Sequence, residues 1–215
     1  MSLSLYYHPL SSYCQKVLIA LYENDTPFER RPVDLGNPEE RARFAALWPM
    51  AKFPVLRDDA KGKTVPESTI IIEYLEVFYP GKTRLIPADA TEAIACRLMD
   101  RIFDLHVHDQ MQKIVGDKLR PEGRHDPEGV LRARATLQTA YRLLESELAD
   151  RRWALGDTFS LADCAACPAL FFANRVEPFS ETHPRLGAYF ARLTERPSFA
   201  RATAEAAPFI KLFPG

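Results

Sequence analysis

The clearest concentration of reactive side chains is a short turn near the N-terminus, where Ser11, Ser12, Tyr13 and Cys14 follow one another. The turn precedes a predicted helix, and the start of a helix presents unpaired N–H groups and the positive end of the helix dipole. Both features favour an anion such as a thiolate. Serine is also a common helix cap, which is the simpler interpretation of Ser11 and Ser12 when the turn is considered alone. The turn therefore predicts either a helix cap or a thiolate-binding site.

Two further positions could bind a ligand. Phe53-Pro54 places a proline where a strand should begin. Because proline cannot donate to a central ladder, this predicts a sheet edge, a bulge or a cis turn. Glu67 and Ser68 open a helix directly after Pro66. There they could cap the helix, or hold the ammonium and carboxylate groups of a ligand with help from the free N–H groups of the helix start.

Two pairs of potential metal ligands are better explained without a metal. Cys164 and Cys167 are three residues apart in an apolar run, so they share one face of a helix and are predicted to lie in the core. His106 and His108 are two residues apart, which places them about 200° apart around a helix. They cannot chelate one ion from an intact helix. No metal is expected.

The elements that must position these residues begin with an α/β segment. Alternating and aromatic residues predict strands, and apolar residues at helical spacing predict the helices between them. The expected elements are a strand over 3–7, a helix to about 24, a strand over 28–33, a short helix from 38, a hairpin over 53–65 and a helix from 67 to about 78. Their order is βαβ, a connecting helix, and then ββα.

The rest of the chain predicts only helices. The apolar faces of the first two consist of Ile94, Leu98, Ile102 and Leu105, and of Leu137, Tyr141, Leu144 and Leu148. Further helices are expected over 161–174, 184–194 and 198–205. Ser160 and Asp163 predict a variant of the capping box at the start of the first of these, which is a structural role. We therefore expect an α/β domain over 1–80, a linker over 81–90 and an all-helical domain over 91–215.

Length and composition limit the class of protein. The 215 residues correspond to roughly 1.4 typical domains, and 47% of them are apolar, which predicts a packed core. Lys and Arg number 28 against 29 Asp and Glu, without the basic excess that nucleic-acid binding usually needs. Apolar runs fall far short of the ~20 residues that span a bilayer. Four cysteines make no disulfide framework. We expect a soluble, reduced, cytoplasmic protein.

Four segments, in this order along the chain, resemble motifs of the glutathione transferase superfamily. Residues 6–21 are similar to the start of its serine-type (theta- and zeta-like) classes, and residues 49–56 to the segment leading into its cis-proline. Residues 66–75 resemble its γ-glutamyl-binding helix start, and residues 156–163 its second-domain capping signature. The sequence departs from the family pattern at Trp48, where Asn is common, and at Ala51, where Gly is common. The resemblance implies a thioredoxin-like N-terminal domain followed by an all-α C-terminal domain.

The resemblance also implies roles for residues of the site. Ser11 aligns with the serine that hydrogen-bonds the glutathione thiolate. Phe53, before an implied cis-Pro54, would pair by its backbone with the cysteinyl part of glutathione. The γ-glutamyl end would be held by Glu67 and Ser68. Lys52 would reach the glycine carboxylate, and the electrophile pocket is expected to include Leu10, His106 and Met111.

The activity implied in this way is activation of glutathione as a thiolate for attack on an apolar electrophile, by conjugation or peroxide reduction. Glutathione would be the co-substrate, without a metal, and the protein would form a homodimer without nucleic-acid or membrane partners. Two alternatives remain at this point. Cys14, rather than Ser11, could work in glutathione-dependent thiol–disulfide exchange, or the chain could be a non-catalytic binding or assembly module.

Overall fold

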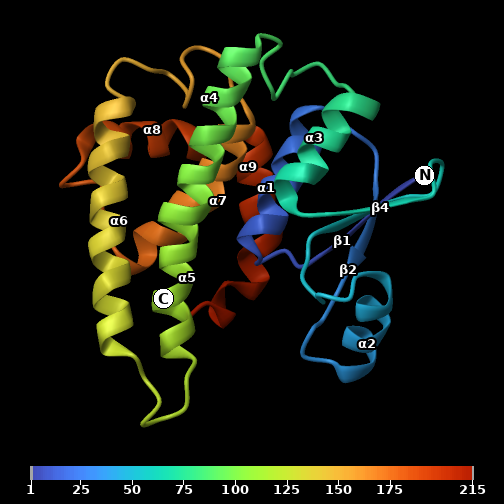
Figure 1. Ribbon diagram of the computed structural model, residues 1–215, viewed down its shortest axis with the longest axis horizontal. Coiled ribbons are helices and arrows are strands. Elements are labelled where there is room, and N and C mark those ends of the chain that lie inside the picture. Colours follow the sequence, from blue (N-terminus) through green and yellow to red (C-terminus); the bar gives the residue numbers. More distant parts are fainter. Residues whose placement is uncertain (1, 215) are drawn as a thin grey trace.

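A four-stranded sheet forms the centre of the first domain in the computed structural model, which describes residues 2–214 (Figure 1). The strand order is β2-β1-β3-β4, with β2 parallel and β3 antiparallel to β1. The strands are β1 (Leu3–Tyr7), β2 (Glu29–Pro32), β3 (Val55–Asp58) and β4 (Lys63–Pro66). The helices of this domain are α1 (Ser12–Glu23), α2 (Pro38–Leu47) and α3 (Ser68–Phe78). The βαβ–α–ββα order predicted from the sequence is confirmed.

Helices cover both faces of this sheet. Alternate residues of β1 point to opposite faces, so Leu3 and Leu5 enter the main core with α1 and α3, whereas Tyr6 packs on the other face. There a smaller cluster forms around Phe44 of α2. Helices α1 and α3 therefore lie on the same face of the sheet, which is the face turned toward the second domain.

The second domain contains helices throughout its described length (Figure 1). They are α4 (Ala90–Arg101), the π-helical segment η1 (Ile102–His108), α5 (Asp109–Lys118), α6 (Pro127–Glu147), α7 (Leu161–Val176), α8 (Pro184–Thr194), α9 (Pro197–Ala206) and the 3₁₀ helix η2 (Ala207–Leu212). Helices α4, η1 and α5 form one long rod, with α6 beside it. Helix α7 is central and packs against α1, α4 and η1. This is the thioredoxin-like plus all-helical fold that the sequence predicts.

One predicted apolar face of this rod lies outside the core. Ile94 and Leu98 are 67% and 60% exposed, and the buried side of α4 consists instead of smaller residues such as Ala93 and Cys96. Apolar spacing identifies a common face, but it does not say whether the chain itself covers that face. By contrast, the predicted face of α6 is buried, and Cys164 and Cys167 are both in the core, as expected.

A buried carboxylate joins the start of α7 to two other segments. Asp163 is fully buried and accepts hydrogen bonds from the Ser160 backbone N–H (2.8 Å) and hydroxyl (2.9 Å). It also accepts from the Ala154 N–H (2.8 Å) and the Tyr189 hydroxyl of α8 (2.7 Å). Asp163 therefore links the loop before α7, the cap of α7 and α8.

Ala51, which stands where the resembled family commonly has glycine, has a backbone φ of 48°. This left-handed conformation costs an L-residue roughly 1–2 kcal/mol, whereas glycine adopts it freely. We expect Ala51→Gly to raise the free energy of unfolding by about 0.5–1 kcal/mol in urea titrations. Ala42→Gly, at an exposed position in the middle of α2, is the matched control and should lower it by about 1 kcal/mol. Equal destabilisation by both changes would contradict the prediction.

No helix in the described part of the chain, residues 2–214, is long and apolar enough to cross a membrane.

Candidate active site

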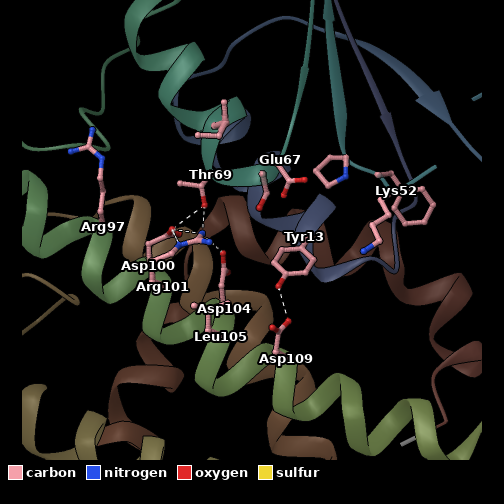
Figure 2. A pocket seen from close by; sticks show the side chains of 14 residues that line it. Tyr13, Lys52, Glu67, Thr69, Arg97, Asp100, Arg101, Asp104, Leu105 and Asp109 are labelled. Atoms are coloured by element: carbon pink, nitrogen blue, oxygen red, sulfur yellow. Dashed lines mark hydrogen bonds and ion pairs between the residues drawn. The ribbon is translucent and has the colours of Figure 1, made fainter. Parts of the chain in front are cut away.

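A cavity of about 650 Å³ lies between the loops of the first domain and the α4–α5 rod of the second (Figure 2). Its first-domain wall consists of Tyr13, Lys52, Phe53, Pro54, Glu67, Ser68, Thr69 and Ile70. Its second-domain wall consists of Arg97, Asp100, Arg101, Asp104, Leu105 and Asp109. The structure therefore brings together the turn at Tyr13, the loop around Pro54, the start of α3 and the rod, which are separate segments of the sequence.

Ser11 caps α1, two residues before the cavity-lining Tyr13. Its backbone is extended, and its hydroxyl oxygen accepts a hydrogen bond from the Cys14 N–H at 3.4 Å. The hydroxyl keeps a proton that it can donate. Gln15, which is fully buried, donates to the Pro9 carbonyl at 3.0 Å and so fixes the loop that leads to Ser11. Ser11 is partly exposed but is not among the cavity-lining residues; Tyr13 is the member of the turn that lines the cavity.

The loop before β3 contributes a backbone edge. The Phe53–Pro54 peptide bond is cis, which selects one of the three conformations that the sequence allows. The ladder between β1 and β3 reaches only the Tyr6–Val55 pair, so the backbone of Phe53 lies beyond the sheet. Its polar groups are available to an extended ligand lying along the loop. Lys52, beside it, is exposed and lines the cavity.

The start of α3 has no side-chain cap. Glu67 occupies the cap position with a φ of 68°, and its side chain makes no capping hydrogen bond. The N–H groups of the first turn, which contains the buried Ser68, therefore remain free for a ligand carboxylate, and the Glu67 carboxylate is free for an ammonium group.

Below this helix start lies a buried charge network that the sequence analysis did not identify (Figure 2). Lys16, only 1% exposed, lies 2.5 Å from Asp100 and 2.8 Å from Asp104, and it donates to the Thr69 hydroxyl at 2.9 Å. Arg101 pairs with both carboxylates, at 2.7 and 2.5 Å. Two cations thus balance two anions. The network joins α1, α3 and the rod. Two features of the sequence could have indicated it: Lys16 lies within an apolar helix, and Asp100 and Asp104 are four residues apart, on one face of a helix.

A second set of contacts fixes Tyr13. Its hydroxyl donates to Asp109 at 3.2 Å, and its ring meets the His108 ring edge-on at 4.2 Å between centroids. His108 is hydrogen-bonded to the Ser12 hydroxyl, and its burial lowers its pKa to about 3. The imidazole is therefore neutral and acts as a structural anchor between α1 and the rod.

The residues expected to surround an electrophile are not in the cavity. His106 is exposed, Met111 is 1% exposed within the core, and Leu10 packs partly buried against the core. None of the three lines the cavity, where Leu105 and Asp109 are found instead. Met111 follows the buried Phe103 and Val107 along the core side of the rod, and His106 lies on the opposite side.

Cys14 is unsuited to act as a thiolate. It is fully buried, and burial raises the pKa of its thiol to about 12. A nucleophilic cysteine needs access and a lowered pKa.

The fold and the cavity define a class of two-domain enzymes in which a thioredoxin-like domain supplies a cis-proline loop and an open helix start, and a helical domain supplies the opposite wall. Comparisons with known proteins agree with this class. The glutathione S-transferase N-terminal domain model matches residues 5–83, and the C-terminal domain model matches residues 120–192.

Two curated relatives and one solved structure illustrate the similarity. A probable maleylacetoacetate isomerase of Vibrio cholerae is 31% identical and covers 97% of this chain and 98% of its own. The glutathione S-transferase GstB of Escherichia coli is 28% identical, covering 87% and 91%. A glutathione S-transferase from Methylobacillus flagellatus with GSH bound superposes with a TM-score of 0.86 at 29% identity, covering 94% and 98%. The chain belongs to the glutathione S-transferase family and is an enzyme of that class.

Proposed function

We propose that the protein activates the thiol of glutathione for attack on an electrophilic substrate. The observation that carries the proposal is that one cavity is lined by Lys52, the cis Phe53–Pro54 loop and the uncapped start of α3, next to the N-terminus of α1. These groups match the three parts of a γ-glutamyl-cysteinyl-glycine tripeptide.

Each group has a role in this proposal. Glu67 binds the γ-glutamyl ammonium group, and the N-terminal turn of α3 at Ser68 binds the γ-glutamyl carboxylate. The Phe53 backbone pairs with the cysteinyl residue, which places its sulfur near Ser11. Lys52 binds the glycine carboxylate. The Ser11 hydroxyl and the dipole of α1 then stabilise the thiolate.

The two alternative functions are less well supported. Thiol–disulfide exchange would need Cys14 as a nucleophile, and its burial and raised pKa argue against that role. A pure assembly module would have no use for an uncapped helix start and a cis-proline loop at one cavity. A cytoplasmic location and the absence of nucleic-acid partners remain predictions from composition.

The proposal is tested by retention on immobilised glutathione and by turnover of a chloronitroaromatic electrophile. We expect both retention and turnover with release of chloride. Retention without turnover would support the binding module, and turnover only of mixed disulfides would support the exchange enzyme.

The exposed apolar face of the rod motivates a prediction about assembly. It adjoins exposed apolar residues of α3, and the Arg97–Glu73 ion pair (2.7 Å) joins the two helices. The exposed residues of this apolar patch are Ile70, Val77 and Phe78 on α3 and Ile94, Leu98 and Leu105 on the rod, and Ile70 and Leu105 at its edge also line the cavity. A patch of this kind usually marks an interaction site. We propose that it binds a second copy, so ultracentrifugation should give twice 24.4 kDa.

Variants separate this interface from other surfaces. Ile94→Glu with Leu98→Glu should give a folded monomer, because each charge would be buried without a partner at the interface. Leu131→Glu, on α6, changes another exposed leucine (62%) outside the patch and should leave the dimer intact. A wild-type monomer at micromolar concentration would contradict the prediction.

A further inference from the structure

Asp109, the first residue of α5, brings a carboxylate to the cavity wall opposite the glutathione loops. It lines the cavity, is half-buried and accepts a hydrogen bond from the Tyr13 hydroxyl at 3.2 Å (Figure 2). Tyr13 lies only two residues after Ser11, so this carboxylate is on the thiol side of the cavity. Leu105, one turn earlier on the rod, lines the same wall.

The charge of Asp109 is not balanced within the described chain. Among residues 2–214, no Lys, Arg or His nitrogen lies within 4.0 Å of its carboxylate. Lys113, one turn further on, donates to Gln110 at 3.0 Å instead. Lys16 and Arg101 are both engaged by Asp100 and Asp104. The neighbouring His108 is buried and neutral.

Glutathione would not supply the missing charge. In the binding mode proposed above, its ammonium group pairs with Glu67, and its two carboxylates go to the α3 start and to Lys52. Asp109 then remains an unpaired anion beside the position of the second substrate. A hydrogen bond from a phenol satisfies part of a carboxylate but leaves its negative charge.

We propose that Asp109, held in place by Tyr13, is a specificity-determining residue that selects electrophiles with a cationic or hydrogen-bond-donating group and disfavours those with a carboxylate. This inference rests on the proposed function. It also replaces the expectation of a purely apolar electrophile. Leu105 shares the second-domain wall with charged side chains, and the Tyr13 phenol and the Asp109 carboxylate meet beside it. A carboxylate brought next to Asp109 would meet a like charge in a partly water-excluded cavity, which is costly.

The test uses three chloronitrobenzenes that differ only in the group para to chlorine: trimethylammoniomethyl, carboxamide or carboxylate. In each reaction the glutathione thiolate forms a C–S bond at the carbon that bears chlorine, the C–Cl bond breaks, and chloride leaves. Dividing kcat/KM by the rate constant with free glutathione at the same pH removes differences in intrinsic reactivity. We expect the cation and the amide to exceed the carboxylate by tenfold or more.

Asp109→Asn should reduce the disadvantage of the carboxylate relative to the amide about tenfold, mainly through KM. Tyr13→Phe removes the hydrogen bond that holds Asp109 but keeps its charge, so the preference should persist and weaken by less than in Asp109→Asn, which separates the effect of the charge from that of the contact. Asp150→Asn, an exposed aspartate with the same change of charge, should leave all ratios unchanged.

The outcomes distinguish the two proposals. Turnover without a charge preference in the wild type, or an unchanged ratio in folded Asp109→Asn, overturns the role of Asp109 and leaves the proposed function standing. Failure of the wild type to turn over any of the three electrophiles overturns both.

Discussion

Replacing Ser11 by alanine should lower the rate of glutathione conjugation by about 10- to 100-fold and raise the pH at which the bound thiol ionises. A free thiol with a pKa of ~8.5 is only ~3% thiolate at pH 7, and a site that lowers this to ~6.5 makes it ~75% thiolate. The shift requires ~2.7 kcal/mol. A hydrogen bond to a charged sulfur supplies ~1.5–3 kcal/mol, and the helix dipole adds up to ~1.

The sign of the pH effect follows from this stabilisation. Without the Ser11 hydroxyl the thiolate loses stabilisation relative to the thiol, so its pKa rises and the rate profile moves to higher pH. Thiolate absorbance and kcat/KM measured against pH should shift together. Glutathione should still bind, because Lys52 and the start of α3 are unchanged.

Cys14→Ala is the matched control for this turn. Because Cys14 is fully buried, its removal should leave conjugation within a few-fold of the wild type. An active Ser11→Ala together with an inactive, folded Cys14→Ala would reject the serine mechanism and favour thiol–disulfide exchange.

Replacing Asp163 by alanine should destabilise the fold by about 3–5 kcal/mol. The change removes the acceptor of four hydrogen bonds at a fully buried position, and buried donors left without partners cost about 1–3 kcal/mol each. For a chain of this length, that corresponds to a decrease in Tm of roughly 6–20 °C. Calorimetry or urea unfolding would measure it.

Two comparisons define this prediction further. Tyr189→Phe removes one of the four donors and should cost about 1 kcal/mol. Asp150→Ala, at an exposed position, should stay within about 0.5 kcal/mol. If folded Asp163→Ala kept its Tm but lost catalysis, the structural role of this residue would be wrong.

Local sequence patterns were sufficient for the first domain and for part of the site. Alternating and aromatic residues over 3–7 predict β1, and the apolar residues spaced along the segment after Ser11 predict α1, because these patterns are local and do not depend on distant contacts. For Pro54 the sequence allowed a sheet edge, a bulge or a cis turn, and the structure shows that the Phe53–Pro54 bond is cis. The hydrogen bond between Ser160 and Asp163 was also predicted, since the two residues are only three positions apart.

Contacts between distant segments could not be predicted in this way. The Ala154 and Tyr189 partners of Asp163 depend on how a loop and α8 fold against α7. A helix cap alone typically contributes about 1 kcal/mol to stability, and these further hydrogen bonds raise the expected contribution of Asp163 to several. The buried pairing of Lys16 depends on the docking of two domains. The expected pocket residues on the rod, His106 and Met111, lie outside the cavity lining for a related reason. Helical spacing assumes a uniform α-helix, and the side chains presented beyond η1 depend on the irregularity within it.

That irregularity determines how the rod would respond to a change in its length. At the end of η1 the Asp109 N–H bonds the Asp104 carbonyl, five residues back rather than four. The wide turn takes up one extra residue, so loss of one residue within η1 would restore a regular helix there and leave the direction of the α5 side chains unchanged. Asp109 would stay beside Tyr13, and Met111 would stay in the core. The same loss within α4 or α5 would instead rotate everything beyond it by about 100°. A one-residue difference in length within η1 is therefore a change that this rod can absorb, and it would alter the side chains of the wide turn alone.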